Sequence, residues 1–510
     1  MDLLPRLIFP TTTTTAETAT ETEMSSPATS TSASSSATTS PTSRAYDLIF
    51  VGASGFVGKL ATMHLLKRYG SDPSAAGFSW ALSARNEARL KQVHEEILEE
   101  LKEWQQEQQQ EQAKGQKGQT KIQSEEAKEE KKEEKKTAPH HQTATTHATL
   151  MENRLRNIDV MYGDVDDPSF ARSLAKKTKV IAASLTPYSL HGSRLVEACV
   201  AEGTHYVDIS GEMLWIKENI DKYHEEAKEK GVRIVHACGL GSVPADLSVH
   251  LMLHRLHEEH VHVKEVKFMM GPVYSSLGGG SMTSYATLIK TGREQGKIMQ
   301  MLDPHLLTPP KLRENTHEVN ITPKTFGMGF DLDLRRFTAP LWLAALDDQV
   351  VARSAALLGY PSFRYVEAQT YSFSLFGLVS AFLTWIASFA FAGLLYMGPT
   401  RWLLTKVRPP GSGPNRLIRE KGHGTAYVVG KGTTQGGGKV TYVGEFDMPQ
   451  GDPGYMETSK MLVESALCLV LDMDKLPQPQ HRGGVLTPAA AFGQVLMDRL
   501  HRASGMSFKM

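Results

Sequence analysis

Residues 46–58 read YDLIFVGASGFVG, and residues 59–69 continue as KLATMHLLKRY. A short apolar run breaks into a turn with glycines at positions 52, 55 and 58, and a helical pattern follows. A buried strand that leads through such a turn into a helix begins a dinucleotide-binding α/β unit. Gly52 suits the sharp turn, Gly55 the approach of a pyrophosphate, and Gly58 the close packing of helix on strand. The alternative is a tight strand-to-helix turn that binds no ligand.

The N-terminus of the helix after this turn would offer unpaired N–H groups and a positive dipole end to phosphate. We therefore predict cofactor contacts along the turn and at the first helical residue, namely at Gly52, Ser54, Gly55, Phe56 and Gly58.

The end of the second apolar strand, Ser79–Ala84, bears on the choice of cofactor, because Arg85 follows it directly. NAD-specific sites carry an acid here for the ribose 2′-hydroxyl, whereas an arginine accommodates the 2′-phosphate of NADP. The first acid is Glu87, so the sequence favours NADP (NADPH) over NAD. The alternative is that Arg85 is a solvated residue that opens the next helix.

Two further strands are expected at Asp159–Tyr162 and Lys179–Ser184. Asp164 lies where such folds contact the adenine end of the cofactor, and the alternative is that the stretch GDVDDP at 163–168 caps the next helix. Thr186 and Pro187 should lie beside the nicotinamide half, because ligands bind beyond the carboxyl ends of strands in open α/β sheets. The predicted fold is α/β: a Rossmann-type, doubly wound parallel sheet with a second, α+β substrate domain.

The composition narrows the class of protein. The 510 residues are enough for two or more domains. Lys plus Arg and Asp plus Glu both number 56, so the formal net charge is zero. The overall charge therefore gives no reason to expect a nucleic-acid partner. Three cysteines without CxxC spacing indicate a reducing compartment, and the 19 histidines show no metal-ligand spacing, so we expect no metal.

Two segments have low complexity. Residues 1–44 are rich in Ser, Thr and Ala and are predicted to be a disordered tail. Residues 105–149 are rich in Gln, Glu and Lys, and we interpret them as a solvated insertion, partly helical at most, after a helix at Glu87–Leu101. A coiled-coil partner site is the alternative, but apolar a and d positions are missing after Trp104.

Further along the chain, distinctive blocks follow one another: TPYSLHG at 186–192, YVDISGE at 206–212, SVPADL at 242–247, GGGSMTS at 278–284, DPGYMETSKMLVESALCL at 452–469 and GGVLTPAAAFG at 483–493. Together with the glycine turn, they resemble the saccharopine dehydrogenase-like oxidoreductases, a family that includes trans-acting enoyl reductases. The resemblance spans nearly all of residues 46–510 outside the low-complexity insertion, and it implies NADP-dependent reductase chemistry. The chain departs from the family pattern at Thr186, His191 and Gly241, which also admits a member with weak or lost catalysis.

Reduction of a carbon–carbon or carbon–nitrogen double bond needs a proton donor near the reacting atom and a wall that excludes water. Tyr188 and His191 are the candidate catalytic donors, and Asp208 or Glu212, near the end of a fifth strand at Tyr206–Ile209, is the candidate orienting carboxylate. The alternatives are structural, with Asp208 capping the next helix and Tyr188 packed in the core.

Residues 375–397 read LFGLVSAFLTWIASFAFAGLLYM, in a stretch without charge between Glu367 and Arg401. The run is long enough to span a membrane, and Arg401, Lys406 and Arg408 beyond it suit a cytosol-facing interface. A core helix is the alternative, but only a thin polar seam of Ser380, Thr384 and Ser388 interrupts the run. A single span would separate the C-terminal blocks from the glycine turn, so we favour insertion into one leaflet.

We expect an NADP-binding domain at 45–210, a substrate domain at 211–370, a membrane-associated segment at 371–400 and a C-terminal part at 401–510 that completes the fold.

The first functional hypothesis is an NADP-dependent oxidoreductase that acts on a lipid-derived substrate on the cytosolic face of a lipid droplet or the endoplasmic reticulum. A saccharopine-type amino-acid dehydrogenase is the second, although no Arg cluster is evident around Tyr188 or Asp208 to clamp carboxylates. A non-catalytic NADP-binding scaffold on lipid droplets is the third. A homodimer is compatible with each hypothesis.

Overall fold

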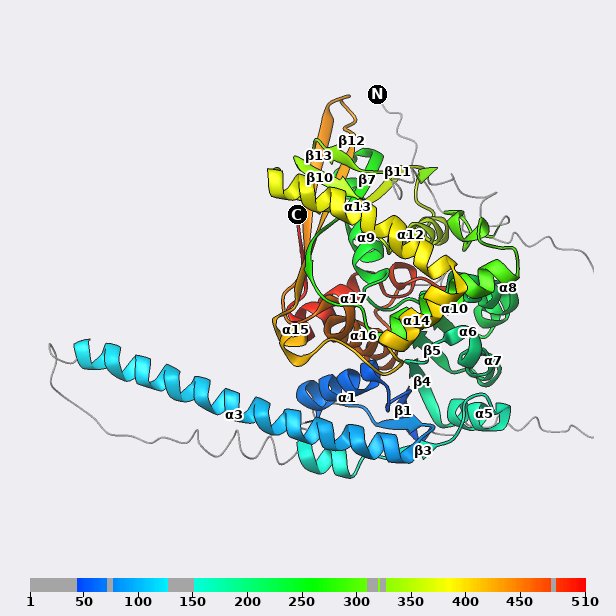
Figure 1. Ribbon diagram of the computed structural model, residues 1–510, viewed down its shortest axis with the longest axis vertical. Coiled ribbons are helices and arrows are strands. Elements are labelled where there is room, and N and C mark those ends of the chain that lie inside the picture. The colour runs from blue at the N-terminus through cyan, green and yellow to red at the C-terminus, as the bar shows by residue number, and fades with distance from the viewer. Residues whose placement is uncertain (1–43, 71–76, 127–150, 310–319, 322–326, 478–482) are drawn as a thin grey trace, which may run out of the picture. The chain divides into compact units, whose positions relative to one another are not determined.

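The computed structural model describes residues 44–70, 77–126, 151–309, 320–321, 327–477 and 483–510 (Figure 1). The predictions for residues 1–43 and 127–149 lie outside these ranges. Residues Arg44–Met510 form one compact unit.

The glycine turn belongs to a sheet of seven parallel strands in the order β14-β6-β5-β4-β1-β2-β3. The strands are β1 (Tyr46–Val51), β2 (Trp80–Ala84), β3 (Val160–Tyr162), β4 (Thr178–Ala183), β5 (His205–Asp208), β6 (Arg233–Val235) and β14 (Gly484–Leu486). The order of the first six is that of a dinucleotide-binding sheet, with the switch point between β1 and β4. The predicted Rossmann-type parallel sheet is confirmed.

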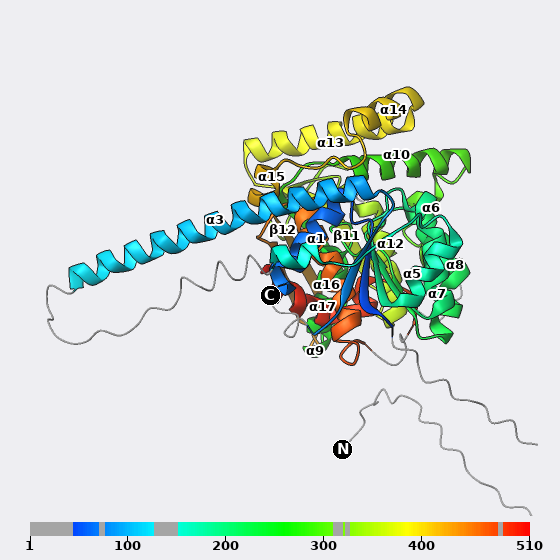
Figure 2. The same cartoon turned by 90° about the horizontal axis from the view of Figure 1, so that it is seen from below.

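Helices cover both faces of this sheet (Figure 2). One face carries α1 (Phe56–Tyr69), α3 (Glu87–Glu126) and α16 (Thr458–Leu471), and the other carries α5 (Pro168–Lys177), α7 (Ser193–Glu202) and α8 (Met213–Glu229). Alternate side chains of β1 serve the two cores, since Leu48 and Phe50 pack on the first face and Ile49 and Val51 on the second. The buried part of the strand, residues 48–51, is therefore entirely apolar.

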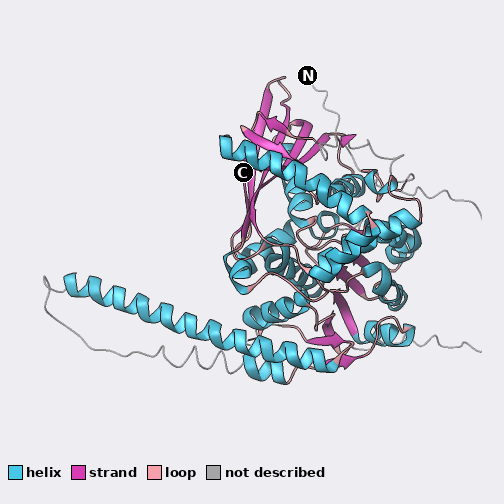
Figure 3. Ribbon diagram, in the orientation of Figure 1, coloured by secondary structure: helices cyan, strands magenta, loops and turns pink. Residues whose placement is uncertain are grey.

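A second sheet follows, in the order β15-β13-β12-β7-β11-β10-β9, with β8 paired to β11. Figure 3 shows the strands in two separate groups. The strands are β7 (His262–Tyr274), β8 (Asn320–Ile321), β9 (Gly329–Asp331), β10 (Arg336–Ala339), β11 (Arg364–Tyr371), β12 (His423–Thr433), β13 (Lys439–Met448) and β15 (Ser507–Lys509).

Further helices of the described residues pack around and between the two sheets. They are α6 (Tyr188–His191), α9 (Val243–Glu258), α10 (Gly279–Glu294), α12 (Ala344–Leu358), α13 (Leu375–Tyr396), α14 (Gly398–Val407), α15 (Arg416–Lys421) and α17 (Pro488–Ser504), with a 3-10 turn at Gln300–Leu302 and a π turn at Pro453–Glu457.

Two boundaries differ from the expected ones. The parallel sheet does not end at residue 210, because β6 and β14 extend it through hydrogen bonds that no local pattern encodes. The helix expected at Glu87–Leu101 continues as α3 to Glu126, so the first part of the predicted insertion is helical throughout. Lys59 of α1 and Arg419 of α15 both pair with Glu100, which ties the first turns of α3 to the core.

Candidate active site

The glycine turn has the geometry that its three glycines predict. Gly52 has a φ of +90°, and a Cβ there would lie 2.3 Å from the carbonyl oxygen of Ser184. A Cβ at Gly58 would lie 2.3 Å from the carbonyl oxygen of Gly52, so the helix can pack on the strand only with glycine. Gly55 precedes α1, and a Cβ there would meet only the Gly52 oxygen, at 3.2 Å.

The N-terminus of α1 fits the phosphates of a dinucleotide. No side chain caps it and no acidic residue lies in its first turn, so its dipole is available to an anion. Ser54, Gly55 and Phe56 are all half-buried at this position. The start of α1 is therefore the candidate position for a pyrophosphate.

Thr186 and Pro187 lie just after β4, next to this turn, as the strand register requires. The N-terminus of α10 lies opposite, since a Cβ at Gly280 would be 3.7 Å from Thr186 Oγ1. The segment Gly278–Ser281 thus approaches the place where the fold puts the nicotinamide end of a dinucleotide.

A second segment from the C-terminal part of the chain completes this region. The Tyr455 ring packs edge-on against Phe56, with 5.5 Å between ring centroids, and its hydroxyl oxygen accepts from the Gly278 N–H. The same oxygen lies 2.9 Å from Ser281 Oγ, and Gly279 N–H donates to the carbonyl oxygen of Ser412. We call the group formed by Gly52–Gly58, Thr186, Gly278–Ser281, Ser412 and Tyr455 the glycine-turn site.

Arg85 and Asp164 lie together at the adenine side of the sheet. Arg85 is exposed at the end of β2, and its Nη1 lies 3.5 Å from Asp164 Oδ2. Asp164 does not cap α5, since Asp167 does so by accepting from the Ser169 N–H. The helix cap expected within the stretch GDVDDP at 163–168 is therefore confirmed, with Asp167 as the capping residue. The adenine-side role of Asp164 stays a prediction.

Tyr188 and Glu212 are buried and hydrogen-bonded to each other, through the Tyr188 backbone N–H and the Glu212 carboxylate. Tyr188 is 2 % exposed, its hydroxyl donates to the carbonyl oxygen of Ala183, and burial raises the pKa of its hydroxyl well above the usual value. The Glu212 carboxylate accepts from the N–H groups of Tyr188 and Ser189 and from the hydroxyl of Ser284. This arrangement is the structural alternative considered for Tyr188, because its proton already has an acceptor.

His191 and Asp208 do not meet, contrary to the expected donor–carboxylate pairing. His191 Nδ1 lies 2.8 Å from Asp166 at the surface. Asp208 is fully buried and lies 2.8 Å from His236 Nδ1, and it also accepts from the Ser210 N–H. The carboxylate that the sequence singled out thus orients His236, which follows β6, because β5 and β6 are neighbours in the sheet.

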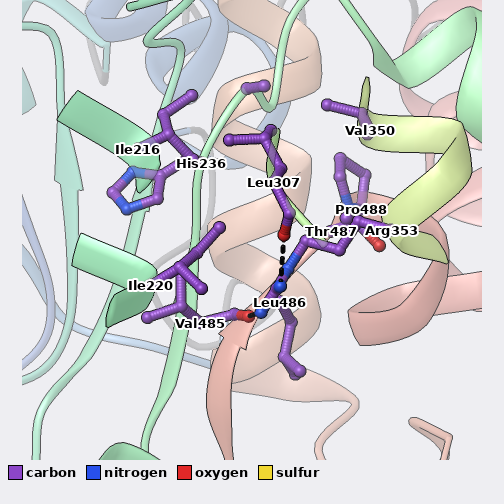
Figure 4. Close-up of a pocket in the computed structure, with 11 residues that line it drawn as sticks. Ile216, Ile220, His236, Leu307, Val350, Arg353, Val485, Leu486, Thr487 and Pro488 are labelled. Atoms are coloured by element: carbon purple, nitrogen blue, oxygen red, sulfur yellow. Dashed lines mark hydrogen bonds between the residues drawn. The ribbon is translucent and has the colours of Figure 1, made fainter. Parts of the chain in front are cut away.

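A small cavity lies beyond the carboxyl ends of β6 and β14, with room for about one water molecule (Figure 4). His236 and Arg353 lie in its largely apolar wall. Arg353 donates to the carbonyl oxygens of Leu307 and Val485, each at 2.6 Å. The cavity is too small for a cofactor or an acyl chain, so the glycine-turn site remains the candidate for both.

Tyr455, Ser281 and His236 are the residues that sequence reasoning missed. Tyr455 and Ser281 lie inside blocks that carried the family resemblance, but nothing in the sequence brings position 455 next to position 56. Within the described residues, no group of three or more His, Cys, Asp or Glu side chains is placed to hold a metal.

This sheet order, with an uncapped helix N-terminus after a glycine turn at the switch point, defines a dinucleotide-binding protein. The saccharopine dehydrogenase NADP binding domain matches residues 122–235. A Mycobacterium tuberculosis protein designated a trans-acting enoyl reductase is 30% identical over 488 residues, which covers 92% of this chain and 98% of that protein. The trans-acting enoyl reductase of Mycobacterium ulcerans is 31% identical over 364 residues, covering 67% of this chain and 82% of the relative.

Among solved structures, apo saccharopine dehydrogenase (L-Glu forming) from Saccharomyces cerevisiae aligns with a TM-score of 0.44 at 11% identity, over 91% of this chain and 99% of that one. The chain belongs to the saccharopine dehydrogenase-like family of NADP-binding oxidoreductases. The expected family, the NADP cofactor and the oxidoreductase class are thus confirmed.

Proposed function

We propose that this oxidoreductase uses NADPH to reduce a carbon–carbon double bond in a lipid-derived acyl chain at a membrane or lipid-droplet surface. The observation that carries the proposal is an exposed apolar surface on α13 and α14 that leads directly to the glycine-turn site. The names of the relatives, trans-acting enoyl reductases, support the reaction type.

The helix α13 is apolar enough to cross a membrane by length and composition, with a mean hydropathy of 2.0 over its most apolar 18 residues, yet only 17% of that window is buried. Gly377, Ala381, Ser388 and Leu395 form its buried line. The exposed large apolar side chains on α13, α14 and next to them are Phe373, Leu375, Phe376, Leu378, Val379, Phe382, Leu383, Ile386, Phe389, Leu394, Tyr396, Met397, Trp402, Leu403 and Val407. Apolar patches of this extent mark contact with a membrane or a partner.

The contacts of α13 support insertion into one leaflet. Thr384 is hydrogen-bonded to Tyr371 of β11, Phe391 packs edge-on against Trp342, and Arg293 of α10 donates to the Tyr396 carbonyl oxygen. A helix held along its length by its own unit cannot stand upright across a bilayer without losing these contacts. Arg401, Lys406 and Arg408 beyond α13 support a location on the cytosolic face of a lipid droplet or the endoplasmic reticulum.

The apolar surface is continuous with the site. Figure 2 shows α13 and α14 following one another along one side of the unit, with α10 beneath them. The chain that leaves α14 reaches the start of α10, where Ser412 accepts from Gly279 N–H and a Cβ at Gly413 would touch the Phe56 ring. An acyl chain held among the exposed apolar side chains of α14 would therefore lie next to the glycine-turn site.

The residues of the site fit NADPH, which would supply a hydride when bound. The α1 N-terminus would hold the pyrophosphate, Arg85 the 2′-phosphate, and Thr186 would border the nicotinamide. Tyr455, Phe56 and Ser412 would cover this region and exclude water.

The test has two readouts on the purified full-length protein: flotation with phosphatidylcholine vesicles, and NADPH oxidation with trans-2-dodecenoyl-coenzyme A in those vesicles. We expect the wild-type protein to float with the vesicles and to oxidise NADPH with this substrate. The double variant Leu383→Lys, Ala387→Lys, on the exposed face, should stay in solution while it still binds NADPH. Ala381→Lys is the matched variant on the buried line, and it should instead destabilise the fold by several kcal/mol. A wild-type protein that remains in solution would contradict the membrane location, and flotation without turnover would favour the scaffold.

A further inference from the structure

We propose that Tyr455 is the proton donor for this reduction, an assignment that rests on the proposed function. Neither Tyr188 nor His191 is placed for that role, and the hydroxyl of Tyr455 lies in the glycine-turn site itself.

Tyr455 is held at the site by groups that leave its hydroxyl pointing to the start of α10. Its ring contacts Phe56, the first residue of α1, and the side chain is 6 % exposed. Its oxygen accepts from the Gly278 N–H and lies 2.9 Å from Ser281 Oγ. Two neighbours that can stabilise a tyrosinate are thus in place: a backbone N–H at a helix N-terminus and a hydroxyl.

The hydroxyl also lies near the expected reacting atoms. Ser281 follows Gly280, the residue opposite Thr186 at the end of β4. The nicotinamide end of a dinucleotide lies beyond β4 in this fold. A substrate double bond placed against that end would therefore be bordered by Thr186, Gly280 and the hydroxyls of Ser281 and Tyr455.

The backbone around Tyr455 forms a rare π-helical turn, which supports a functional role for this residue. Residues Pro453–Glu457 form a π turn before α16, a geometry that occurs frequently at functional sites. The turn is anchored on both sides of Tyr455, because Asp452 N–H donates to the Arg419 carbonyl and Glu457 N–H to the Asp452 carbonyl. A donor that is rigidly held in this way can deliver its proton to one face of a substrate double bond.

The step balances as follows for an enoyl thioester. The β-carbon gains a hydride from NADPH, which is oxidised to NADP⁺, while the π electron pair moves onto the α-carbon and the thioester. Tyr455 gives its hydroxyl proton to the α-carbon, and the electron pair of the O–H bond stays on the tyrosine oxygen. Gly278 N–H and Ser281 stabilise this oxygen until water returns a proton through the Ser281 hydroxyl.

The experiment uses the full-length protein, NADPH and trans-2-dodecenoyl-coenzyme A in phosphatidylcholine vesicles made in D₂O. Wild-type protein should place deuterium on the α-carbon in a single configuration. Tyr455→Phe should lower kcat at least 100-fold, leave the Kd for NADPH within threefold, and give deuterium in both configurations. The control is Tyr442→Phe, which removes a surface hydroxyl bonded to Glu259 on the second sheet and should change none of these values.

Replacement of Tyr455 by 3-fluorotyrosine keeps the shape of the side chain and makes the phenol more acidic. It should move the alkaline limb of the kcat/KM profile to lower pH, and this readout remains if Tyr455→Phe fails to fold. Full turnover and single-configuration labelling by Tyr455→Phe, loss of NADPH binding in that variant, or an unmoved pH profile would each overturn the assignment. A wild-type protein that binds NADPH but does not reduce the thioester would overturn the proposed function, and the donor role with it.

Discussion

Three carboxyl groups, those of Asp347, Asp348 and Glu367, are buried close together between α12 and β11. Tyr365 donates to Glu367, and Ser242 donates to Asp347. Burial raises the pKa of Asp347 to about 7, and burial followed by the charge of Asp347 raises the pKa of Asp348 to about 8. These groups therefore hold protons near neutral pH, in contrast to exposed carboxylates.

A raised carboxyl pKa makes stability depend on pH. The folded state binds the Asp348 proton more tightly than the unfolded chain, so its contribution is complete below about pH 4 and is lost as the pH rises towards about 8. We expect Asp348→Asn, which removes this titration, to gain up to about 1.4 kcal/mol per pH unit over wild type across that range. Urea unfolding of both proteins from pH 5 to pH 8 measures the difference, and parallel curves would contradict the burial of an ionisable group here.

Arg85 is the residue on which we expect the cofactor preference to depend. Its side chain is 66 % exposed and shares its charge with Asp164, so a 2′-phosphate has to compete with that carboxylate. We expect NADPH to bind at least tenfold more tightly than NADH, Arg85→Ala to remove that preference, and Asp164→Asn to strengthen NADPH binding. Titration of NADPH and NADH fluorescence gives the dissociation constants, and equal values for the unmodified protein would refute the prediction.

At the scale of elements, the glycine turn combines a requirement for close helix–strand packing at Gly58 with a proposed requirement for phosphate binding at Gly55. Gly58 is needed for the packing of α1 on β1, since a Cβ there would lie 2.3 Å from the Gly52 oxygen. A Cβ at Gly55 would meet one atom, the same Gly52 oxygen at 3.2 Å, so Gly55 is the less constrained of the two. Gly58→Ala should destabilise the protein by about 1–3 kcal/mol, because the added methyl meets backbone atoms that cannot move aside.

Gly55→Asp should have the opposite profile. An acid at a helix N-terminus favours the helix slightly, so the variant should melt near the wild-type temperature, but its charge would repel the pyrophosphate and abolish NADPH binding. Thermal unfolding together with NADPH fluorescence separates the two variants. Retained NADPH binding by folded Gly55→Asp would mean that the turn is only structural.

At the scale of the whole molecule, the N-terminal and C-terminal parts of the chain share one buried ionic network. Glu464 of α16 lies 2.8 Å from His64 Nε2 of α1 and 2.9 Å from Arg499 Nε of α17, and Arg499 also pairs with Asp472. Burial alone would raise the pKa of Glu464, but these partners lower it below its usual value. The helix that carries the glycine turn is thus joined to the last helix of the chain.

Removal of one partner from this network should weaken the entire unit. Arg499→Met would leave Glu464 buried with a reduced counter-charge, and we expect a loss of about 3–5 kcal/mol. Because the network includes α1, NADPH binding and global structure should be lost in one transition when urea is added. Circular dichroism and NADPH fluorescence recorded on the same samples test this expectation, and separate transitions would show that the two ends of the chain fold independently.

The sequence alone determined the features that depend on neighbours along the chain. The strand, the turn and the helix at residues 46–69 and the arginine at the end of β2 could be predicted, because a glycine triplet and an apolar run act through local backbone geometry. The family was predicted from the resemblance of several sequence blocks in the expected order. The apolar character of α13 was also evident from composition. Its large exposed face was not, since a core helix and a membrane-bound helix have the same composition.

Only the tertiary structure decided which side chains meet. Asp208 pairs with His236 because β5 and β6 are adjacent, Tyr455 reaches Phe56 from almost four hundred residues away, and β14 joins the first sheet from the end of the chain. Contacts of this kind depend on sheet order and helix packing. One local sequence pattern is compatible with many such tertiary arrangements. The candidate donor therefore moved from Tyr188, whose hydroxyl the fold buries against Ala183, to Tyr455, whose hydroxyl the fold brings to the start of α10.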